Sequence, residues 1–198
     1  MNELLIVFCK NPILGKVKTR LAKKVGDNKA LEIYKVLLSN ALKVARGSSR
    51  DFAVYFHDHI DSNDFWRGAR YKQVQKGADI GERMDNAIND GLQKGYDSIV
   101  LIGADVYGLT SKIVDEAFEH LISNDVVIGP ARDGGYYLIG MKAHNSKIFT
   151  LSEWSTPRVL KETLLLVKQE KVRYYLVDEL NDIDDIHDLK ETELFKLL

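Results

Sequence analysis

The sequence has 198 residues, of which 45% are hydrophobic and 29% are charged, and its formal net charge is -1. This composition indicates a soluble globular chain and excludes a disordered or low-complexity protein. The near-neutral charge provides no basic field to attract a nucleic acid. No apolar run approaches the roughly 20 residues that span a bilayer, and no basic region precedes the first apolar run, so we expect a cytoplasmic protein without a signal peptide.

The first apolar run, residues 4–9, predicts a buried strand. The loop that follows, residues 10–21, contains a proline and a glycine and presents three cations, Lys16, Lys18 and Arg20. Such a loop is a candidate cradle for phosphates, because Arg binds them bidentately and Lys acts as a point charge. The alternative is that the cations form a solvated face. The loop matches neither a P-loop nor a dinucleotide fingerprint, which disfavours a dehydrogenase.

Apolar periodicity predicts alternating strands and helices along the rest of the chain, which is typical of an α/β fold. The expected strands are residues 4–9, 52–56, 71–75, 99–102, 125–130, 136–141 and 172–177. The expected helices lie at residues 27–47, 80–92, 110–122 and 157–167, with helix also expected from Leu21 and a terminal helix after the acidic turn at residues 182–189. Asp27 is expected to cap one helix, and Pro157 is expected at the first position of another.

A buried strand ends just before Asp105, the first candidate for a metal ligand. Open α/β sheets bind ligands at the carboxyl ends of their strands, and an isolated Asp there is costly unless it holds a cation or a hydrogen-bond donor. Alternatively, Asp105 caps a turn. The acidic segment at residues 182–188 offers carboxylates that could bind the same divalent cation from the side opposite Asp105. Some of these carboxylates are expected instead to cap the next helix.

Three further positions carry reactive side chains with more than one interpretation. His57 and His59 flank an aspartate and could bind a metal, but no third ligand is close in sequence, which favours a polar strand end. Asp133 begins an Asp-Gly-Gly bend that permits a hairpin or an edge crossing and lets a ligand approach the backbone. Alternatively, the Asp-Gly pair is there only because it favours a turn. Cys9, the single cysteine, excludes an internal disulfide and is interpreted as a strand residue rather than a nucleophile.

Several motifs occur in a recognisable order. They are Phe8 to Leu21 with its Lys-Thr-Arg, Gly77 to Met84, Gly103-Ala-Asp105, Gly129 to Gly140 with its Asp-Gly-Gly-Tyr, and Trp154-Ser-Thr156. Together they resemble the GT-A-type transferase family associated with radical-SAM and selenodomain proteins. That family is similar to the molybdenum cofactor and phospholactate guanylyltransferases of the nucleotide-diphospho-sugar transferase superfamily. The resemblance implies a single-domain, Rossmann-like GT-A fold over residues 1–198, with a mostly parallel mixed sheet flanked by helices.

The resemblance also implies a set of site residues. The implied nucleotide-binding residues are Pro12, Gly15, Lys16, Lys18, Arg20, Gly81 and Arg83. Mg²⁺ or Mn²⁺ is implied on Asp105 and Asp184, with Asp182 as the alternative to Asp184. Asp133, on the acceptor side, and Arg20 are the implied catalytic residues. The chain departs from the superfamily at Tyr107, where a proline is usual, and in its late acidic segment, which lacks a Thr-Pro pair.

The leading hypothesis is therefore a metal-dependent transferase that uses a nucleotide or nucleotide-sugar donor. Transfer from such donors requires neutralisation of phosphates, which the cations, the carboxylates and a metal could provide together. The sequence leaves open whether a glycosyl or a nucleotidyl group is transferred, and to which small-molecule acceptor. The rival hypothesis is a non-catalytic nucleotide-binding module that serves a partner enzyme. Neither hypothesis involves a nucleic acid or a membrane, and the oligomeric state is left open.

Overall fold

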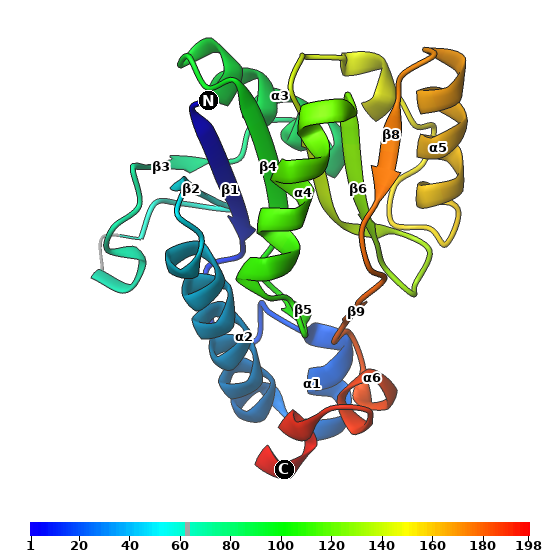
Figure 1. Cartoon of the computed structure of the whole chain (residues 1–198). Coiled ribbons are helices and arrows are strands. Elements are labelled where there is room, and N and C mark those ends of the chain that lie inside the picture. The colour runs from blue at the N-terminus through cyan, green and yellow to red at the C-terminus, as the bar shows by residue number, and fades with distance from the viewer. Residues whose placement is uncertain (62–63) are drawn as a thin grey trace.

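Seven strands form one mixed sheet at the centre of the computed structural model, which describes residues 1–61 and 64–198 (Figure 1). The strands are β1 (Glu3–Cys9), β2 (Asp51–Phe56), β3 (Tyr71–Val74), β4 (Ser98–Gly103), β6 (Val126–Pro130), β7 (Tyr136–Met141) and β8 (Tyr174–Leu176). Their order is β3-β2-β1-β4-β7-β6-β8. Of these seven, β7 runs antiparallel to both of its neighbours, while the other pairs are parallel. The predicted α/β fold with a mostly parallel mixed sheet is confirmed.

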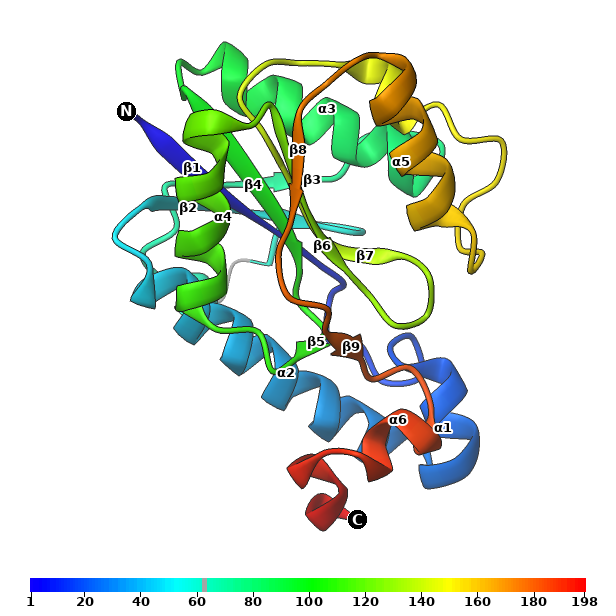
Figure 2. The ribbon, with the colours of Figure 1, turned by 45° about the vertical axis from the view of Figure 1, so that its right-hand side comes forward.

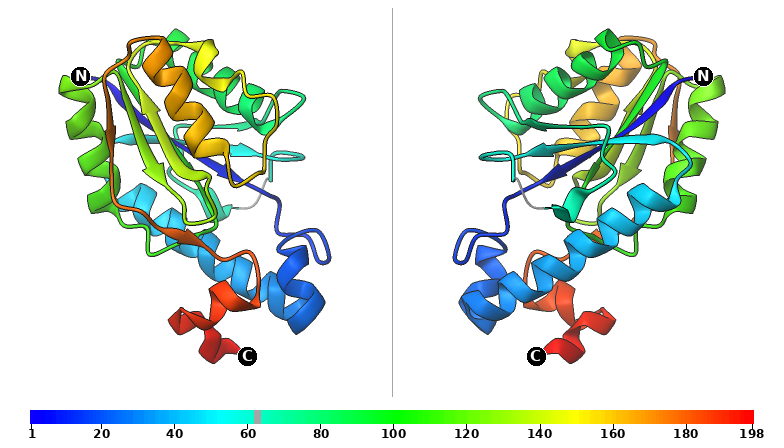
Figure 3. Two further views of the ribbon diagram at one scale, coloured as in Figure 1. Left: turned by 90° about the vertical axis from the view of Figure 1, so that its right-hand side faces the viewer. Right: turned by 90° about the vertical axis from the view of Figure 1, so that its left-hand side faces the viewer.

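Helices cover both faces of the sheet. Those on the faces are α2 (Asp27–Gly47), α3 (Ile80–Gln93), α4 (Ser111–Ser123) and α5 (Val159–Gln169), while α1 (Thr19–Val25) and α6 (Ile186–Lys190) lie below the sheet as drawn in Figure 1. Figures 2 and 3 show α3 and α5 on one face and α2 and α4 on the other. None of the helices in residues 1–61 and 64–198 combines the length and the apolar character needed to cross a membrane.

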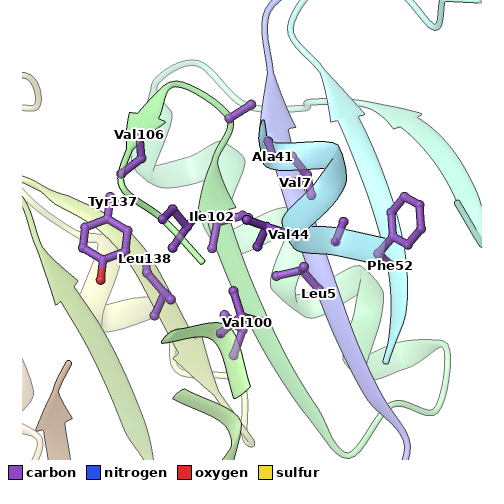
Figure 4. Close-up of a cluster of buried hydrophobic side chains, with 14 of the residues drawn as sticks. Leu5, Val7, Ala41, Val44, Phe52, Val100, Ile102, Val106, Tyr137 and Leu138 are labelled. Carbon is purple, nitrogen blue, oxygen red and sulfur yellow. The ribbon is translucent and has the colours of Figure 1, made fainter. Parts of the chain in front are cut away.

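The central strands are apolar on both faces because helices bury both faces. In β1, Leu5 and Val7 contribute to the cluster under α2 and α4, part of which is drawn in Figure 4. Leu4 and Ile6, the alternate residues, pack in the cluster under α3 and α5. All four side chains have no exposed surface. The period-two alternation of a strand therefore explains why an unbroken apolar run, rather than an alternating one, forms β1.

A third, smaller cluster joins the helices after the first loop to the C-terminal segment, below the sheet as drawn in Figure 1. It combines Leu21 of α1, Ile33 and Leu37 of α2, and Ile183 and Leu189 of the late acidic segment and α6. Figure 1 shows α1 and α6 next to each other at this end of the molecule. The packing fixes the first loop and the late acidic segment relative to one another.

Two helix starts differ from the sequence prediction. Asp27 is the first residue of α2, and Gly26, whose φ is 82°, is the N-cap. Helix α5 begins at Val159 with Arg158 as its N-cap, because the hydroxyl of Thr156 accepts a hydrogen bond from the Arg158 backbone N-H and so closes a turn before the helix. Pro157 therefore lies in that turn and not at the first helical position. The Asp-Gly-Gly bend forms an antiparallel hairpin between β6 and β7, one of its two predicted alternatives.

A two-residue ladder, absent from the sequence prediction, lies at the carboxyl ends of β1 and β4. Strand β5 (Val106–Tyr107) pairs antiparallel with β9 (Asn181–Asp182), and Val106 stands opposite Asp182. Tyr107, which replaces the expected proline, pairs with Asn181 in this ladder. The ladder brings the late acidic segment alongside the turn that carries Asp105.

Candidate functional site

Lys18 lies at the centre of a charged cluster formed by the first loop and two distant segments. Its Nζ donates to Asp105 Oδ2 at 2.8 Å and to Asp184 Oδ1 at 3.3 Å, and only 4% of its side chain is exposed. Burial by itself lowers the pKa of the ammonium, but the two carboxylates outweigh it and raise that pKa above its usual value. The ammonium therefore stays charged and bridges carboxylates that are far apart in sequence.

Asp105 follows β4 in a turn attached to β1. The N-H of Ala104 donates to the Phe8 carbonyl at 3.0 Å, which continues the strand pairing up to the turn. The side chain of Asp105 is 40% accessible from the pocket described below. Desolvation favours its neutral form, but Lys18 outweighs that effect and holds the pKa of Asp105 below its usual value. Asp105 is therefore an ionised carboxylate that a ligand can reach.

The late acidic segment divides into residues that cap a helix and residues that face Lys18. Asp185 and Asp188 form a capping box at the start of α6, in which each side chain accepts a backbone hydrogen bond. Asp184 instead faces Lys18 and lies 3.5 Å from an Arg20 guanidinium nitrogen, with 44% of its side chain exposed. The predicted capping role thus holds for two of the carboxylates, and Asp184 is left available to the cluster.

Asp182 is a carboxyl of this group whose surroundings favour its neutral form. Burial, and then the charges of Asp133, Asp184 and Asp105, raise its pKa to about 6. Because the folded protein holds this proton to a higher pH than the unfolded chain does, Asp182 makes the protein less stable as the pH rises from about 4 to about 6. Its ionised form is therefore costly unless a cation comes close.

Two adjoining pockets open at this edge of the sheet. The polar one, about 490 Å³, is lined by Lys10, Val17, Lys18, Thr19, Arg20, Tyr34, Ile80, Asp105, Asp133, Tyr136, Ser155, Asp182 and Asp184. The second, about 200 Å³, has mostly apolar walls that include Phe8, Met84, Leu101, Val106, Tyr137 and Leu138. Asp105, Asp133 and Asp182 line both pockets. The carboxylates therefore stand at the boundary between a charged compartment and an apolar one.

Asp133 both shapes a turn and faces a pocket that a ligand could enter. Its Oδ1 accepts the Gly135 N-H at 2.8 Å, so it does shape the turn. The same exposed side chain also lines both pockets. The structure thus brings Lys18, Arg20, Asp105, Asp133 and Asp184 to one pocket, and their functional roles stay predictions.

The other predicted nucleotide-binding residues do not line the polar pocket. Lys16 is exposed, and Pro12 lines a different pocket beside α2. Gly15, in the first loop, has a φ of 73°. Gly81, the second residue of α3, lies against the ring of Trp154, where a Cβ would lie 2.1 Å from a ring carbon, so the requirement for glycine is one of packing.

Arg83 connects α3 to the loop after β2. Its Nε donates to the Gly77 carbonyl at 3.1 Å, and a terminal nitrogen lies 2.8 Å from His57 Nδ1. The ring of His59 lies 3.4 Å from the side-chain nitrogen of Asn11. These contacts favour the polar-strand-end interpretation of the two histidines. Cys9 is a buried residue of β1, and burial raises the pKa of its thiol to about 12, which disfavours a nucleophilic role.

Asn11 and three pocket-lining residues were not predicted from the sequence as residues of the site. Asn11, 2% exposed, donates to the His59 carbonyl at 2.9 Å and accepts from the Asp58 N-H at 3.2 Å, which ties the first loop to the loop after β2. Lys10, Tyr34 and Tyr136 line the polar pocket. A polar residue directly before a proline in a loop after a buried strand was the available signal for Asn11. Tyr136 ends the Asp-Gly-Gly-Tyr motif, which was its available signal, whereas no comparable pattern marks Tyr34.

The donor atoms can be tested against the divalent cation that the resemblance implies. Within residues 1–61 and 64–198, no group of three or more His, Cys, Asp or Glu side chains is arranged to hold a metal ion. Asp105 and Asp184 nevertheless direct one oxygen each at the same cationic atom, Lys18 Nζ. Mg²⁺ is commonly held by one or two carboxylates completed by substrate phosphates and water. The pair therefore fits such an ion in its donor chemistry.

Comparison with protein families gives one match. The model of the family described as an uncharacterized protein conserved in bacteria, DUF2064, matches residues 41–156. The chain belongs to the DUF2064 family. The matched range includes Asp105 and Asp133 but neither the Lys18 loop nor Asp184. A search of curated proteins gave no match.

Solved structures resemble this DUF2064 protein over its whole length. A Desulfovibrio desulfuricans G20 protein, provisionally named a nucleotide-diphospho-sugar transferase, has 28% identity and a TM-score of 0.89, covering 100% of this chain and 94% of its own. A Methanothermobacter nucleotidyl transferase has 12% identity and a TM-score of 0.68, covering 100% and 99%. A Mycobacterium tuberculosis H37Rv protein in complex with manganese has 13% identity and a TM-score of 0.56, covering both chains fully. At these identities, the last two likenesses concern the fold alone.

Proposed function

We propose that this DUF2064 protein is a metal-dependent transferase with a nucleotide or nucleotide-sugar donor. One observation carries the proposal: Lys18, Arg20, Asp105 and Asp184 line one polar pocket at the carboxyl ends of β1 and β4. In open α/β sheets, ligands bind at the carboxyl ends of the strands. The transferase names of the Desulfovibrio and Methanothermobacter proteins support the proposal.

In the proposed site, the donor's phosphates lie against the cations of the polar pocket. Lys10, Lys18 and Arg20 supply positive charge where negative charge develops in transfer from a diphosphate or triphosphate. Asp105 and Asp184 would hold Mg²⁺ or Mn²⁺, which supplies further charge neutralisation when bound. The manganese complex of the Mycobacterium protein supports this choice of ion. The acceptor enters the apolar pocket, so that Asp133, on the shared wall, orients it or takes its proton.

We also propose which group the protein transfers and which transferase families it is related to. The basic first loop favours nucleotidyl transfer, in which an NTP donor releases pyrophosphate, whereas glycosyl transfer would release a nucleoside diphosphate. The motifs around Lys18, Asp105 and Asp133 support kinship with the radical-SAM and selenodomain-associated transferases. They support a similarity to the molybdenum cofactor and phospholactate guanylyltransferases. We propose that residues 1–198 act as one such domain.

A second function is favoured by the position of Lys18. Its ammonium already neutralises Asp105 and Asp184, so the pocket could hold a nucleotide without a metal and without turnover, as a module that serves a partner enzyme. A metal requirement and a released product distinguish the two functions.

The test begins with a thermal-shift screen of nucleoside triphosphates and nucleotide-sugars, with Mg²⁺ and with a chelator. We expect Mg²⁺ to raise nucleotide affinity in the wild-type protein, and nucleotide to raise Mg²⁺ affinity by the same factor. The Asp105→Ala variant should fold and lose this coupling. Product analysis then identifies the transferred group. Equal nucleotide affinity with Mg²⁺ and with chelator would overturn the metal-dependent function, and binding without product across the acceptors tried would favour the binding module.

A further inference from the structure

Lys18 occupies the place between two carboxylates where a divalent cation would stand. Its Nζ is 2.8 Å from Asp105 Oδ2 and 3.3 Å from Asp184 Oδ1. A bound Mg²⁺ would approach carboxylate oxygens to about 2.0 to 2.1 Å. An ammonium and a divalent ion on the same two oxygens would repel each other at close range. The two cations therefore compete for this pair.

The local backbone gives a second, independent reason to assign Lys18 a special role. Lys18 is the N-cap of α1 and has a left-handed backbone, with φ 47° and ψ 44°, and its side chain makes no capping hydrogen bond. Ser, Asp, Asn or Gly is preferred at such a position, and a left-handed backbone is unfavourable for a residue with a Cβ. Strain of this kind persists where the surroundings impose it and is concentrated at functional sites. Local helix formation therefore does not explain the lysine.

Lys18 also has another anion to move to when a donor is present. Lysine carries its charge on a flexible four-carbon stem. Lys18 and Arg20 both line the polar pocket, in which the proposed function puts the donor's phosphates. The 4% exposed Lys18 contacts both carboxylates, whereas the 72% exposed Arg20 contacts Asp184 alone, at 3.5 Å. Of the two, Lys18 is the cation whose release frees both carboxylates.

We propose that Lys18 is an internal counter-ion that replaces a divalent cation in the free protein and leaves Asp105 and Asp184 when that cation binds. The inference rests on the proposed function for its expectation that a divalent ion uses this pair. It adds that the free protein binds the ion weakly because its own lysine competes, and that donor phosphates relieve the competition by accepting the ammonium.

Manganese alone is the probe, because its binding to the full chain is measured by electron paramagnetic resonance without any donor. We expect Lys18→Met to bind Mn²⁺ at least tenfold more tightly than the wild-type protein. Lys24→Met is the matched control: it removes the same charge from an exposed position of α1 that lines neither pocket, and should leave Mn²⁺ affinity unchanged. The double variant with Lys18→Met and Asp105→Asn should return to weak binding.

The outcomes separate this inference from the proposed function. Unchanged or weaker Mn²⁺ binding in Lys18→Met, together with weaker binding in the Asp105→Asn variant, would overturn the lysine's role and leave the metal site intact. Tight binding that survives Asp105→Asn in the double variant would overturn the site itself.

A measurement on the wild-type protein covers the case in which Lys18→Met does not fold. Trace acetylation followed by mass spectrometry reports how accessible each lysine amine is. Mg²⁺, at a concentration that fully displaces Mn²⁺ from the wild-type protein and so occupies the site, should raise the acetylation of Lys18 severalfold and leave that of Lys24 unchanged. Equal acetylation of Lys18 with and without Mg²⁺ would overturn the proposal.

Discussion

The glycine turn next to Asp133 gives a sharp test of how this part of the site is held. Gly134 has a φ of +90°, and a Cβ added there would lie 2.1 Å from the carbonyl oxygen of Pro157, which is a backbone atom. Its own carbonyl accepts the Leu160 N-H at 2.8 Å. In a Gly134→Ala variant, the turn therefore has to move away from the start of α5 as well as take up an unfavourable φ.

Gly95 provides the control for the energetic cost of a positive φ. It has the same φ of +90°, but a Cβ added there meets nothing within 4 Å. Gly95→Ala should therefore lower the free energy of unfolding by about 1 to 2 kcal/mol, the cost of a left-handed backbone for a residue with a Cβ. Gly134→Ala should lower the free energy of unfolding by about 2 to 4 kcal/mol. In this variant the cost of the positive φ is joined by about 0.5 to 1.5 kcal/mol for the lost Leu160 hydrogen bond and by the loss of the contact with Pro157.

Urea unfolding of both variants, followed by circular dichroism, measures these free energies. In thermal unfolding, the extra loss in Gly134→Ala corresponds to a midpoint lower by roughly 2 to 8 °C than that of Gly95→Ala, at about 2 to 4 °C per kcal/mol for a chain of this length. Equal destabilisation in the two variants would refute the close approach of the turn to Pro157, and with it the conclusion that this contact holds the bend that carries Asp133.

Three further predictions concern the charged cluster. Arg20→Ala should weaken nucleotide binding by about 1 to 3 kcal/mol in calorimetry, the range for a lost charge-assisted hydrogen bond, and unchanged affinity would remove Arg20 from the donor site. Asp133→Asn should lower turnover by about 10² to 10⁴ with little change in nucleotide affinity, and full turnover would make Asp133 a turn former only. Asp182→Asn should raise the free energy of unfolding at pH 7.5 by about 1 to 2 kcal/mol in chelator, after discounting for solvent in the open pocket, because it removes a carboxyl whose pKa is raised to about 6. The gain should vanish near pH 4, and a gain that does not depend on pH would contradict that origin.

Much of the fold was predictable because burial leaves a strong pattern in the sequence. Runs such as residues 4–9 and 99–102 are apolar at every position, which a strand covered on both faces requires. The helices α2, α3 and α4 keep one apolar face over several turns. The position of Asp105 after a buried strand followed from the same pattern. These signals are local and repeat over many residues.

The assembly of the charged cluster was not predictable from the residues alone. Its contacts join segments that are far apart in the sequence, and each of those segments is only a few residues long. The ladder between Val106 and Asp182 consists of two residues on each strand, too few for any periodicity. Lys18 and Asp184 are separated by 166 positions. The sequence analysis assigned Lys18 to phosphates and Asp184 to a metal, and no pattern indicated that the two side chains face each other. The start of α5 was predicted two residues early because Thr156 and Pro157 are also good turn residues.

The small ladder between β5 and β9 has a consequence for the order in which the protein becomes complete. The strands β1 and β4 and the helices α2 to α4 all precede residue 124, so much of the sheet can form while the later chain is still being synthesised. Asp182 and Asp184 reach the first loop only after the segment that follows β8 has been made and has paired with Val106. The charged cluster is therefore a property of the whole fold. Local opening of this ladder, together with the small apolar cluster around Ile183 and Leu189, would detach Asp184 from Lys18 while the core strands stay closed.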